Sequence, residues 1–149
     1  ENYNEAIRLD PKIAGCWYSR GRALANNGQI DLAIKDYDEA IRIEPEDTLH
    51  WHYRGDAYAE KGEFSRALDD YNEAILREPS NTRSYYFRGW AYAYSKKFDK
   101  AIDDYNRVIK LKPGHSGAWY NRGLAYKYLG KEAQAEADMD KARELGFKD

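Results

Sequence analysis

The sequence lacks the features that mark several common classes of protein. It has a single cysteine, Cys16, so no disulfide can form within the chain. This leaves the redox compartment open, although unpaired cysteine is more typical of a reducing one such as the cytoplasm. No apolar run approaches the length of a membrane span. The formal net charge of −2 leaves no basic excess to neutralise phosphates, which argues against a nucleic-acid partner.

Residues that carry chemistry in enzymes are equally scarce. The three histidines are His50, His52 and His115. The first two are two positions apart, so on a helix they point in different directions and make a poor pair of metal ligands. Cys16 has no histidine at a suitable spacing and is expected to be a small packing residue. Neither a glycine-rich phosphate loop nor a nucleophile motif occurs. We therefore expect no metal, no cofactor and no enzymatic activity.

Proline is scarce too, yet its placement indicates how the chain is organised. The four prolines, each 34 residues from the next, are Pro11, Pro45, Pro79 and Pro113. Arg-Gly pairs recur with the same period, and their arginines are Arg20, Arg54, Arg88 and Arg122. Three residues before these arginines stand the aromatic residues Trp17, Trp51, Tyr85 and Trp119. A fixed period of this length predicts a protein built from stacked repeats.

Within one period, the spacing of apolar residues predicts two helices. Trp51, Gly55 and Tyr58 share one helical face at steps of four and three residues. A second apolar stripe runs through residues 64–75 and ends before Pro79, which lacks an N–H and clashes with the preceding turn. A glycine costs a helix roughly 1 kcal/mol relative to alanine, so its return at one register predicts a close approach of two helices. The residues predicted to cap the first helices are Thr48, Thr82 and Ser116.

The recurring positions form a known motif. They read Trp51-x2-Arg54-Gly55-x2-Tyr58, followed by Ala67-x3-Tyr71, Ala74 and Pro79. This pattern closely resembles the tetratricopeptide repeat, and the resemblance covers nearly the whole chain. It implies an all-α fold, a right-handed superhelical α-solenoid of stacked antiparallel helix pairs. The expected parts are the second helix of a truncated repeat at 1–13, full repeats at 14–47, 48–81 and 82–115, and a C-terminal capping repeat at 116–149.

One position departs from that family in every full repeat, because Arg20, Arg54, Arg88 and Arg122 stand where the family usually has Leu. Acidic residues recur with the same period and are candidate partners: Asp36, Asp70, Asp104 and Asp138. Arginine offers a carboxylate a two-pronged contact of fixed geometry. We therefore predict a ladder in which each Arg reaches an Asp across helices, in the same or an adjacent repeat. The alternative is that both side chains are solvated on separate faces.

The two ends of the repeat array differ. In the earlier repeats the positions that face the next repeat are apolar, whereas Glu136 and Arg143 stand there in the last one. We expect this last repeat to be a solvated cap at which the array ends. Residues 1–13 supply only half a repeat, so we expect a longer protein upstream and a surface through which copies of the chain can associate.

The resemblance also implies a binding surface, because in this family the first helix of each repeat lines an inner, concave wall. The residues at these groove positions are Tyr18, Arg22, His52, Asp56, Tyr86, Trp90, Tyr120 and Leu124. Repeat packing does not require them, and aromatic side chains supply large contact area at low entropy cost. We therefore expect a peptide or partner segment to bind there. The alternative is that individual tyrosines pack locally between helices.

Some members of the family hold the C-terminal carboxylates of chaperones with a clamp of Lys, Asn and Arg. The residues at the clamp positions here are Tyr18, Arg22, Asp56, Tyr86 and Trp90, so only Arg22 fits that pattern. The leading hypothesis is a protein–protein interaction scaffold that binds another protein or a peptide, without nucleic acid or membrane insertion. Two alternatives are a structural module that forms homo-oligomers through residues 1–13 and the recognition arm of a larger enzyme.

Overall fold

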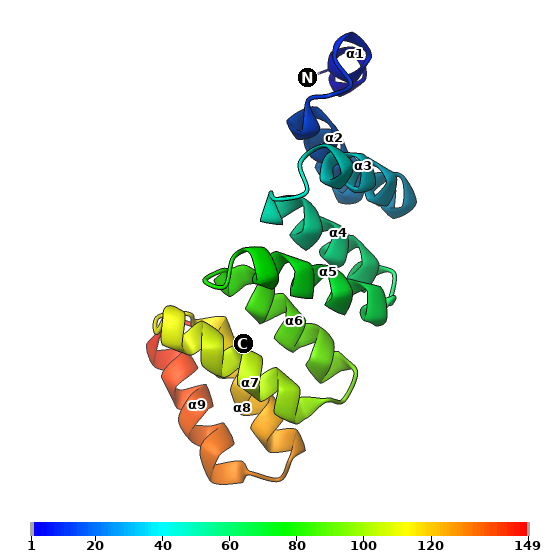
Figure 1. The fold of residues 1–149 in the computed structure, drawn as a ribbon. Helices are drawn as coiled ribbons and strands as arrows, with labels where there is room; N and C mark the ends of the chain where they lie inside the picture. The colour runs from blue at the N-terminus through cyan, green and yellow to red at the C-terminus, as the bar shows by residue number, and fades with distance from the viewer. Residues whose placement is uncertain (1, 149) are drawn as a thin grey trace. The chain divides into compact units, whose positions relative to one another are not determined.

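The computed structural model describes residues 2–148, which form nine helices and no strand. Contacts divide the chain into two compact units, Glu1–Pro79 and Ser80–Asp149. The first unit contains α1 to α5 and the second α6 to α9 (Figure 1). Throughout the described range, every helix is too short or too polar to cross a bilayer.

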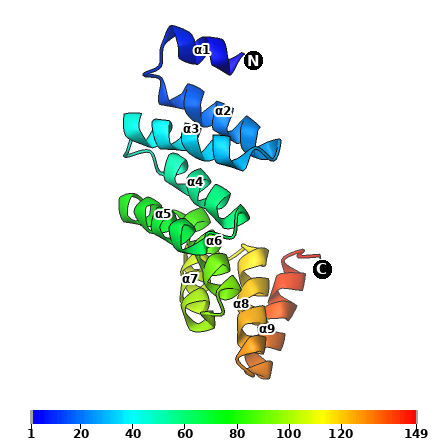
Figure 2. The same cartoon turned by 90° about the vertical axis from the view of Figure 1, so that its right-hand side faces the viewer.

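The first unit is a stack of one short helix and two helix pairs. Its helices are α1 (Tyr3–Leu9), α2 (Ala14–Asn26), α3 (Ile30–Ile43), α4 (Thr48–Glu60) and α5 (Phe64–Arg77). The pair α2 and α3 and the pair α4 and α5 each pack along their length, and α3 also contacts α4. Figure 2 shows α1 lying on the outer side of α2. Each pair falls within one of the repeat ranges expected from the sequence.

The second unit repeats the same arrangement twice. Its helices are α6 (Thr82–Tyr94), α7 (Phe98–Leu111), α8 (Ser116–Tyr128) and α9 (Glu132–Glu144). The helices pair as α6 with α7 and α8 with α9, and α7 contacts α8. Its core is a buried cluster of Ala101, Tyr105, Val108 and Ala118, against which Tyr85 and other aromatic residues pack.

A tyrosine from the second helix fills the centre of each of the first three pairs. Tyr37, Tyr71 and Tyr105 are at most 1% exposed. A Cβ placed on Gly55 would lie 2.8 Å from Cε1 of Tyr71, and Gly21 meets Tyr37 at the same distance. The predicted close approach at the glycines is thus confirmed. The recurring glycine makes room for the tyrosine ring.

The turn inside each pair needs one residue with left-handed backbone geometry. Gly28, Gly62 and Gly130 supply it with φ angles of 74°, 76° and 71°. In the third pair the equivalent residue is Lys96, whose φ is 58°. A side chain in this conformation costs roughly 1–2 kcal/mol. One repeat therefore keeps a strained lysine where its three neighbours use glycine.

The predicted helix caps were wrong by one position. Thr48, Thr82 and Ser116 are the first helical residues, and the residues before them make the capping hydrogen bonds. Asp47 accepts from the backbone N–H of Leu49, Asn81 from that of Ser84 and His115 from that of Ala118. The side chain of the last non-helical residue turns back over the first helical turn, which a residue already inside the helix cannot do.

Candidate functional site

The predicted arginine ladder is confirmed, and each rung lies within one repeat. Nε and Nη2 of Arg54 donate to the two carboxylate oxygens of Asp70 over 2.9 and 2.6 Å. The pairs of Arg20 with Asp36, Arg88 with Asp104 and Arg122 with Asp138 share this two-pronged geometry. All four aspartates are at most 5% exposed, so these are buried charges held by fixed partners.

The third guanidinium nitrogen links neighbouring repeats. Nη1 of Arg20 donates to Asn4, that of Arg54 to Asp38 and that of Arg122 to Asn106, over 2.6–2.8 Å. Each acceptor lies on the second helix of the preceding repeat. One side chain thus joins the two helices of its own pair to the pair before it.

The tryptophans and prolines of the motif also belong to this framework. Nε1 of Trp51 donates to the carbonyl of Pro45 over 2.8 Å, and its ring lies under the guanidinium of Arg54 at 5.1 Å. Trp17 and Trp119 make the same bond to Pro11 and Pro113. The indole therefore fixes the loop before each first helix while it packs against the ladder. The recurrence indicated a packing role for the tryptophan but did not reveal its hydrogen bond to the proline carbonyl.

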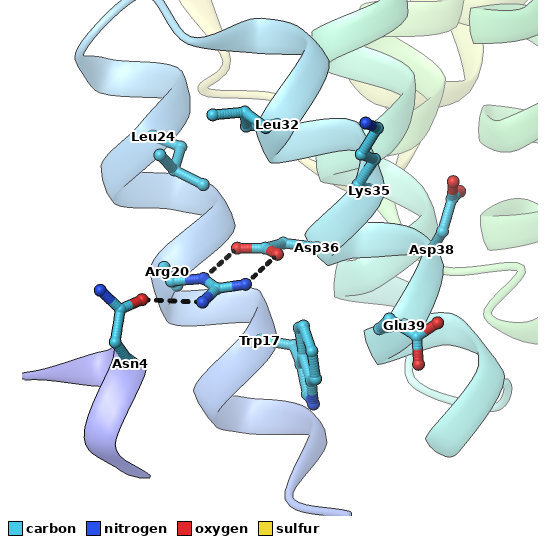
Figure 3. A pocket seen from close by; sticks show the side chains of 9 residues that line it. All are labelled: Asn4, Trp17, Arg20, Leu24, Leu32, Lys35, Asp36, Asp38 and Glu39. Atoms are coloured by element: carbon cyan, nitrogen blue, oxygen red, sulfur yellow. Dashed lines mark hydrogen bonds and ion pairs between the residues drawn. The ribbon is translucent and has the colours of Figure 1, made fainter. Parts of the chain in front are cut away.

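A hollow in the first unit surrounds the first ladder rung (Figure 3). Its volume is about 630 Å³, and Arg20 lies across it with hydrogen bonds to Asp36 and Asn4. Leu24 and Leu32 form one end of the hollow. Because its central cation is already bound by two partners, this hollow belongs to repeat packing.

In the first unit the predicted groove residues form two contacts, and Tyr53 takes part in both. The guanidinium of Arg22 lies 5.7 Å from the ring of Tyr18 and 5.2 Å from that of Tyr53. Burial, together with neighbouring Tyr53, raises the pKa of Tyr18 to about 12, so its phenol stays neutral. Sequence reasoning missed Tyr53, since nothing marked the residue after a groove position as part of the surface.

The second contact joins His52 and Asp56, whose Nε2 and Oδ2 atoms are 3.2 Å apart. The other oxygen of Asp56 accepts from the hydroxyl of Tyr71 over 2.8 Å. His52 differs from its expected place on the groove, because it is only 1% exposed. Its ring packs against Tyr53 and Tyr71 at centroid distances of 5.5 and 5.6 Å. It therefore supports Asp56 from inside and does not face a partner.

In the second unit, two of the predicted groove residues serve packing. Tyr86 accepts a hydrogen bond from Asn121 over 2.9 Å and packs against the His115 ring at a centroid distance of 4.7 Å. Burial raises the pKa of Tyr86, an effect that the bond from Asn121 opposes. Tyr120 stacks on Phe147 with ring centroids 4.2 Å apart. For these two tyrosines the alternative of local packing describes the structure better than an open binding wall.

The other two predicted groove residues of this unit, Trp90 and Leu124, line a cavity of about 320 Å³ between α6, α7 and α8. We call it the aromatic cavity; its lining residues are Trp90, Ala93, Tyr94, Lys96, Phe98, Tyr105, Asn121, Leu124, Ala125 and Tyr128. Phe98 and Tyr128 stack at 4.9 Å on one side, while Trp90 and Tyr94 lie 5.3 Å apart. Trp90, Tyr94 and Tyr128 are 37%, 66% and 73% exposed. Large apolar surfaces so exposed mark interaction sites when they gather around a hollow.

Comparison with known proteins identifies the repeat. Models of the tetratricopeptide repeat match residues 14–47, 53–116 and 88–146. The chain belongs to the tetratricopeptide repeat family. The predicted family and the predicted all-α solenoid fold are therefore confirmed. No curated protein matches the chain.

Solved structures share the fold. A crystal structure of MamA has a TM-score of 0.90 at 26% identity and covers 96% of this chain and 84% of that one. The 41-end fragment of MamA from Desulfovibrio magneticus RS-1 has a TM-score of 0.88 at 22% identity and covers 96% of this chain and 81% of that one. The first TPR of Spaghetti (RPAP3), bound to the HSP90 peptide SRMEEVD, has a TM-score of 0.77 at 27% identity and covers 78% of this chain and 93% of that one.

Proposed function

We propose that this chain is a protein-interaction scaffold whose aromatic cavity holds an apolar side chain of a partner segment. The observation that carries the proposal is the gathering of Trp90, Tyr94 and Tyr128, all exposed, around one hollow of about 320 Å³. Proteins of this repeat family generally serve as scaffolds without enzymatic activity, and the relatives described above support a protein partner. Aromatic residues around a pocket are typical of the few residues that dominate binding energy.

The size of the cavity favours one anchor side chain. Its volume lies at the lower limit of the roughly 300–1,000 Å³ that small-molecule pockets occupy. Its walls are aromatic and aliphatic, with Asn121 as a polar group. An aromatic or branched aliphatic side chain of the partner matches both the size and the apolar lining. The remainder of the partner segment would lie along the exposed faces of α6 and α8.

Lys96 adds a charge to the lip of the cavity. It occupies the turn position where the other full repeats have glycine, and it holds a strained φ of 58°. Strain of this kind is retained where function requires the side chain. An ammonium group at this place complements a carboxylate on the partner. We therefore infer a partner segment with an acidic residue beside its apolar anchor.

This mode differs from the one expected for a chaperone tail. The HSP90 peptide is bound by the Spaghetti domain, whereas the clamp positions of this chain hold Tyr18, Asp56, Tyr86 and Trp90 beside a single Arg22. The surface here has one strained lysine and several aromatic rings in place of a clamp of cations. Apolar contact is therefore expected to contribute most of the affinity.

The proposal is tested with peptides selected on the full chain from a random display library. The dissociation constant of the best peptide is then measured for wild type, Trp90→Ala and Tyr128→Ala. We expect each variant to weaken binding at least about tenfold, the loss typical of an interface residue that dominates affinity. Leu111→Ala is the matched control, because Leu111 is 38% exposed in the same unit but does not line the cavity.

Lys96→Gly tests the charge separately. This variant should unfold at higher urea concentration than wild type, because glycine relieves the strained turn. It should also lose the preference of wild type for peptides with an acidic residue beside the anchor. A wild-type chain that enriches no peptide, or equal binding by Trp90→Ala and Leu111→Ala, would contradict the proposed site.

A further inference from the structure

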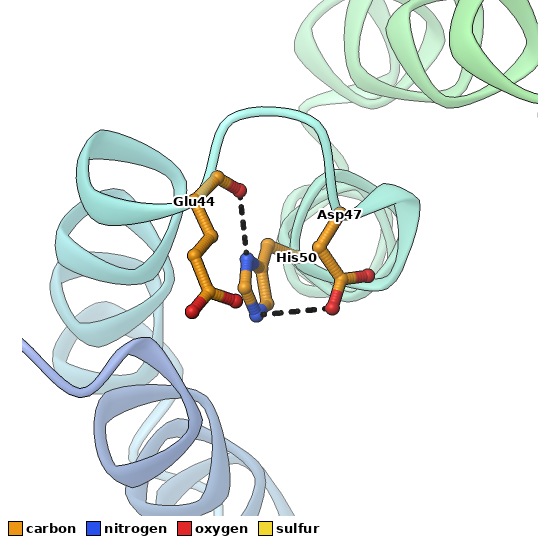
Figure 4. A group of neighbouring side chains, drawn as sticks. All are labelled: Glu44, Asp47 and His50. Atoms are coloured by element: carbon orange, nitrogen blue, oxygen red, sulfur yellow. Dashed lines mark hydrogen bonds and ion pairs between the residues drawn. The ribbon is translucent and has the colours of Figure 1, made fainter.

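The junction between α3 and α4 brings together three side chains that ligate metals (Figure 4). They are Glu44, Asp47 and His50, and one ligand atom of each lies within 4.8 Å of the others. Glu44 follows the last residue of α3, Asp47 caps α4 and His50 lies in its first turn. In the part of the chain that the structure describes, no other group of three meets this spacing.

His50 is held with one ring nitrogen facing the two carboxylates. The residue is 2% exposed, and Tyr18 covers its ring at a centroid distance of 5.5 Å. Its Nδ1 lies 3.3 Å from the backbone carbonyl of Glu44, which can only accept, so Nδ1 carries the hydrogen. Such a bond fixes the tautomer of a metal-binding histidine and leaves the lone pair of Nε2 available.

That lone pair faces an electron-rich atom. Nε2 of His50 lies 3.8 Å from Oδ2 of Asp47, which is longer than a hydrogen bond. The other oxygen of Asp47 accepts from the backbone N–H of Leu49 over 2.9 Å, which keeps Oδ2 turned toward His50. A lone pair and a carboxylate oxygen repel one another at this place unless a proton or a metal cation lies between them. The exposed side chain of Glu44 can rotate to supply a third ligand.

The equivalent positions of the other repeats do not preserve this set. In chain order these triplets are Asp10, Ile13 and Cys16; Glu78, Asn81 and Ser84; and Lys112, His115 and Ala118. Asn81 caps its helix as Asp47 does, so capping alone does not require a carboxylate. The repeat framework does not require a histidine at position 50 either, since Ser84 and Ala118 occupy the same register. The combination at this junction is therefore additional to the needs of the fold.

We infer that Glu44, Asp47 and His50 bind a Zn²⁺ ion. One imidazole nitrogen and two carboxylate oxygens suit Zn²⁺, and a water completes a tetrahedral site, whereas Mg²⁺ and Ca²⁺ prefer oxygen ligands alone. Bonds of about 2.0–2.2 Å place two ligand atoms of a tetrahedral site about 3.3–3.6 Å apart, so side-chain shifts of up to about 1.5 Å close the site. The bound ion would fasten the end of α3 to the start of α4. This inference is independent of the aromatic cavity.

Calorimetric titration of the full, tag-free, metal-stripped chain with ZnCl2 tests the site. We expect one Zn²⁺ per chain, at least about tenfold weaker binding by Glu44→Gln and His50→Gln, and no competition from MgCl2 or CaCl2. The matched control is His115→Gln, which removes a histidine from another repeat junction and should leave binding unchanged. Glu44→Gln keeps the backbone carbonyl that holds His50 and alters only an exposed side chain. This variant therefore tests the metal site even if His50→Gln folds poorly.

Thermal unfolding gives a second readout. ZnCl2 should raise the melting temperature of wild type in a concentration-dependent way, and EDTA should reverse the rise. Glu44→Gln should show a smaller rise at the same metal concentration. Absence of stoichiometric binding, equal binding by Glu44→Gln and wild type, or equal affinity for Mg²⁺ would each overturn the inference.

Discussion

Replacing Gly55 with alanine tests the packing argument on which the fold rests. Gly55 lies inside α4, where an added Cβ would sit 2.8 Å from Cε1 and 3.1 Å from Cδ1 of Tyr71. The same atom would lie 3.3 Å from Cβ of Asp70. Ordinary van der Waals contacts begin near 3.4 Å, so three atoms would have to move. Tyr71 is fully buried and Asp70 is held by Arg54, which leaves neither free to yield.

Two opposing effects set the size of the change. Alanine inside a helix is favoured over glycine by roughly 1 kcal/mol. Overpacking a tight core costs typically 1–3 kcal/mol, and the rigid surroundings of Gly55 place it at the upper end of this range. The net expectation is a loss of about 2 kcal/mol in the free energy of unfolding. In a chain of this size, that loss corresponds to a fall of about 4–8 °C in melting temperature.

Urea unfolding followed by helical circular dichroism measures the effect, and Gly15→Ala is the matched control. Gly15 also lies in the first helix of a repeat, but a Cβ added there meets nothing within 4 Å. This variant should gain up to about 1 kcal/mol, since it keeps the helix preference without the clash. If Gly55→Ala proves as stable as Gly15→Ala, the tyrosine ring does not exclude a methyl group and the packing argument fails.

Two further predictions concern the charged framework. Arg54→Lys should lower the free energy of unfolding by about 1–3 kcal/mol, because lysine keeps the charge but loses the two-pronged bond to Asp70. Urea unfolding measures this loss. The control is Arg42→Lys, which should show no loss because Arg42 pairs with Glu39 on the exposed surface. Burial lowers the pKa of His115, so its contribution to stability is present above about pH 6.5 and is lost as the pH falls through its folded-state value. His115→Asn should remove this part of the pH dependence, since asparagine caps a helix without titrating; an unchanged fall in unfolding free energy between pH 6.5 and 5 would reject that role.

The framework of the fold could be predicted because each of its interactions is repeated. An isolated Arg and Asp give no reason to expect a contact, but four of each at one period require a shared geometry. The distance of 16 residues between Arg54 and Asp70 is the same in every rung. Periodicity thus carries information about contacts between two helices that composition and helix spacing do not carry.

The candidate site was harder to predict because its residues depend on what stands beside them. His52, Tyr86 and Tyr120 occupy groove positions, yet one is buried and the other two pack on neighbouring side chains. The partner of Tyr120 is Phe147, which lies beyond the last helix, 34 residues after Pro113, where the period would place a proline. A register assigns a side chain to a face of a helix, whereas its exposure is decided by local neighbours that differ between repeats.

Differences between equivalent positions are therefore the more informative signal in this chain. The shared residues build nearly the same backbone in each repeat, so a residue that departs from its equivalents needs a local reason. Lys96 keeps a strained turn where Gly28, Gly62 and Gly130 avoid strain, and it lies on the lip of the aromatic cavity. His50 is buried against two carboxylates where its equivalents are small residues. Neither departure is needed to build the repeat, and the strained lysine works against its stability. We therefore assign binding roles to the surroundings of these two residues and a structural role to the recurring motif.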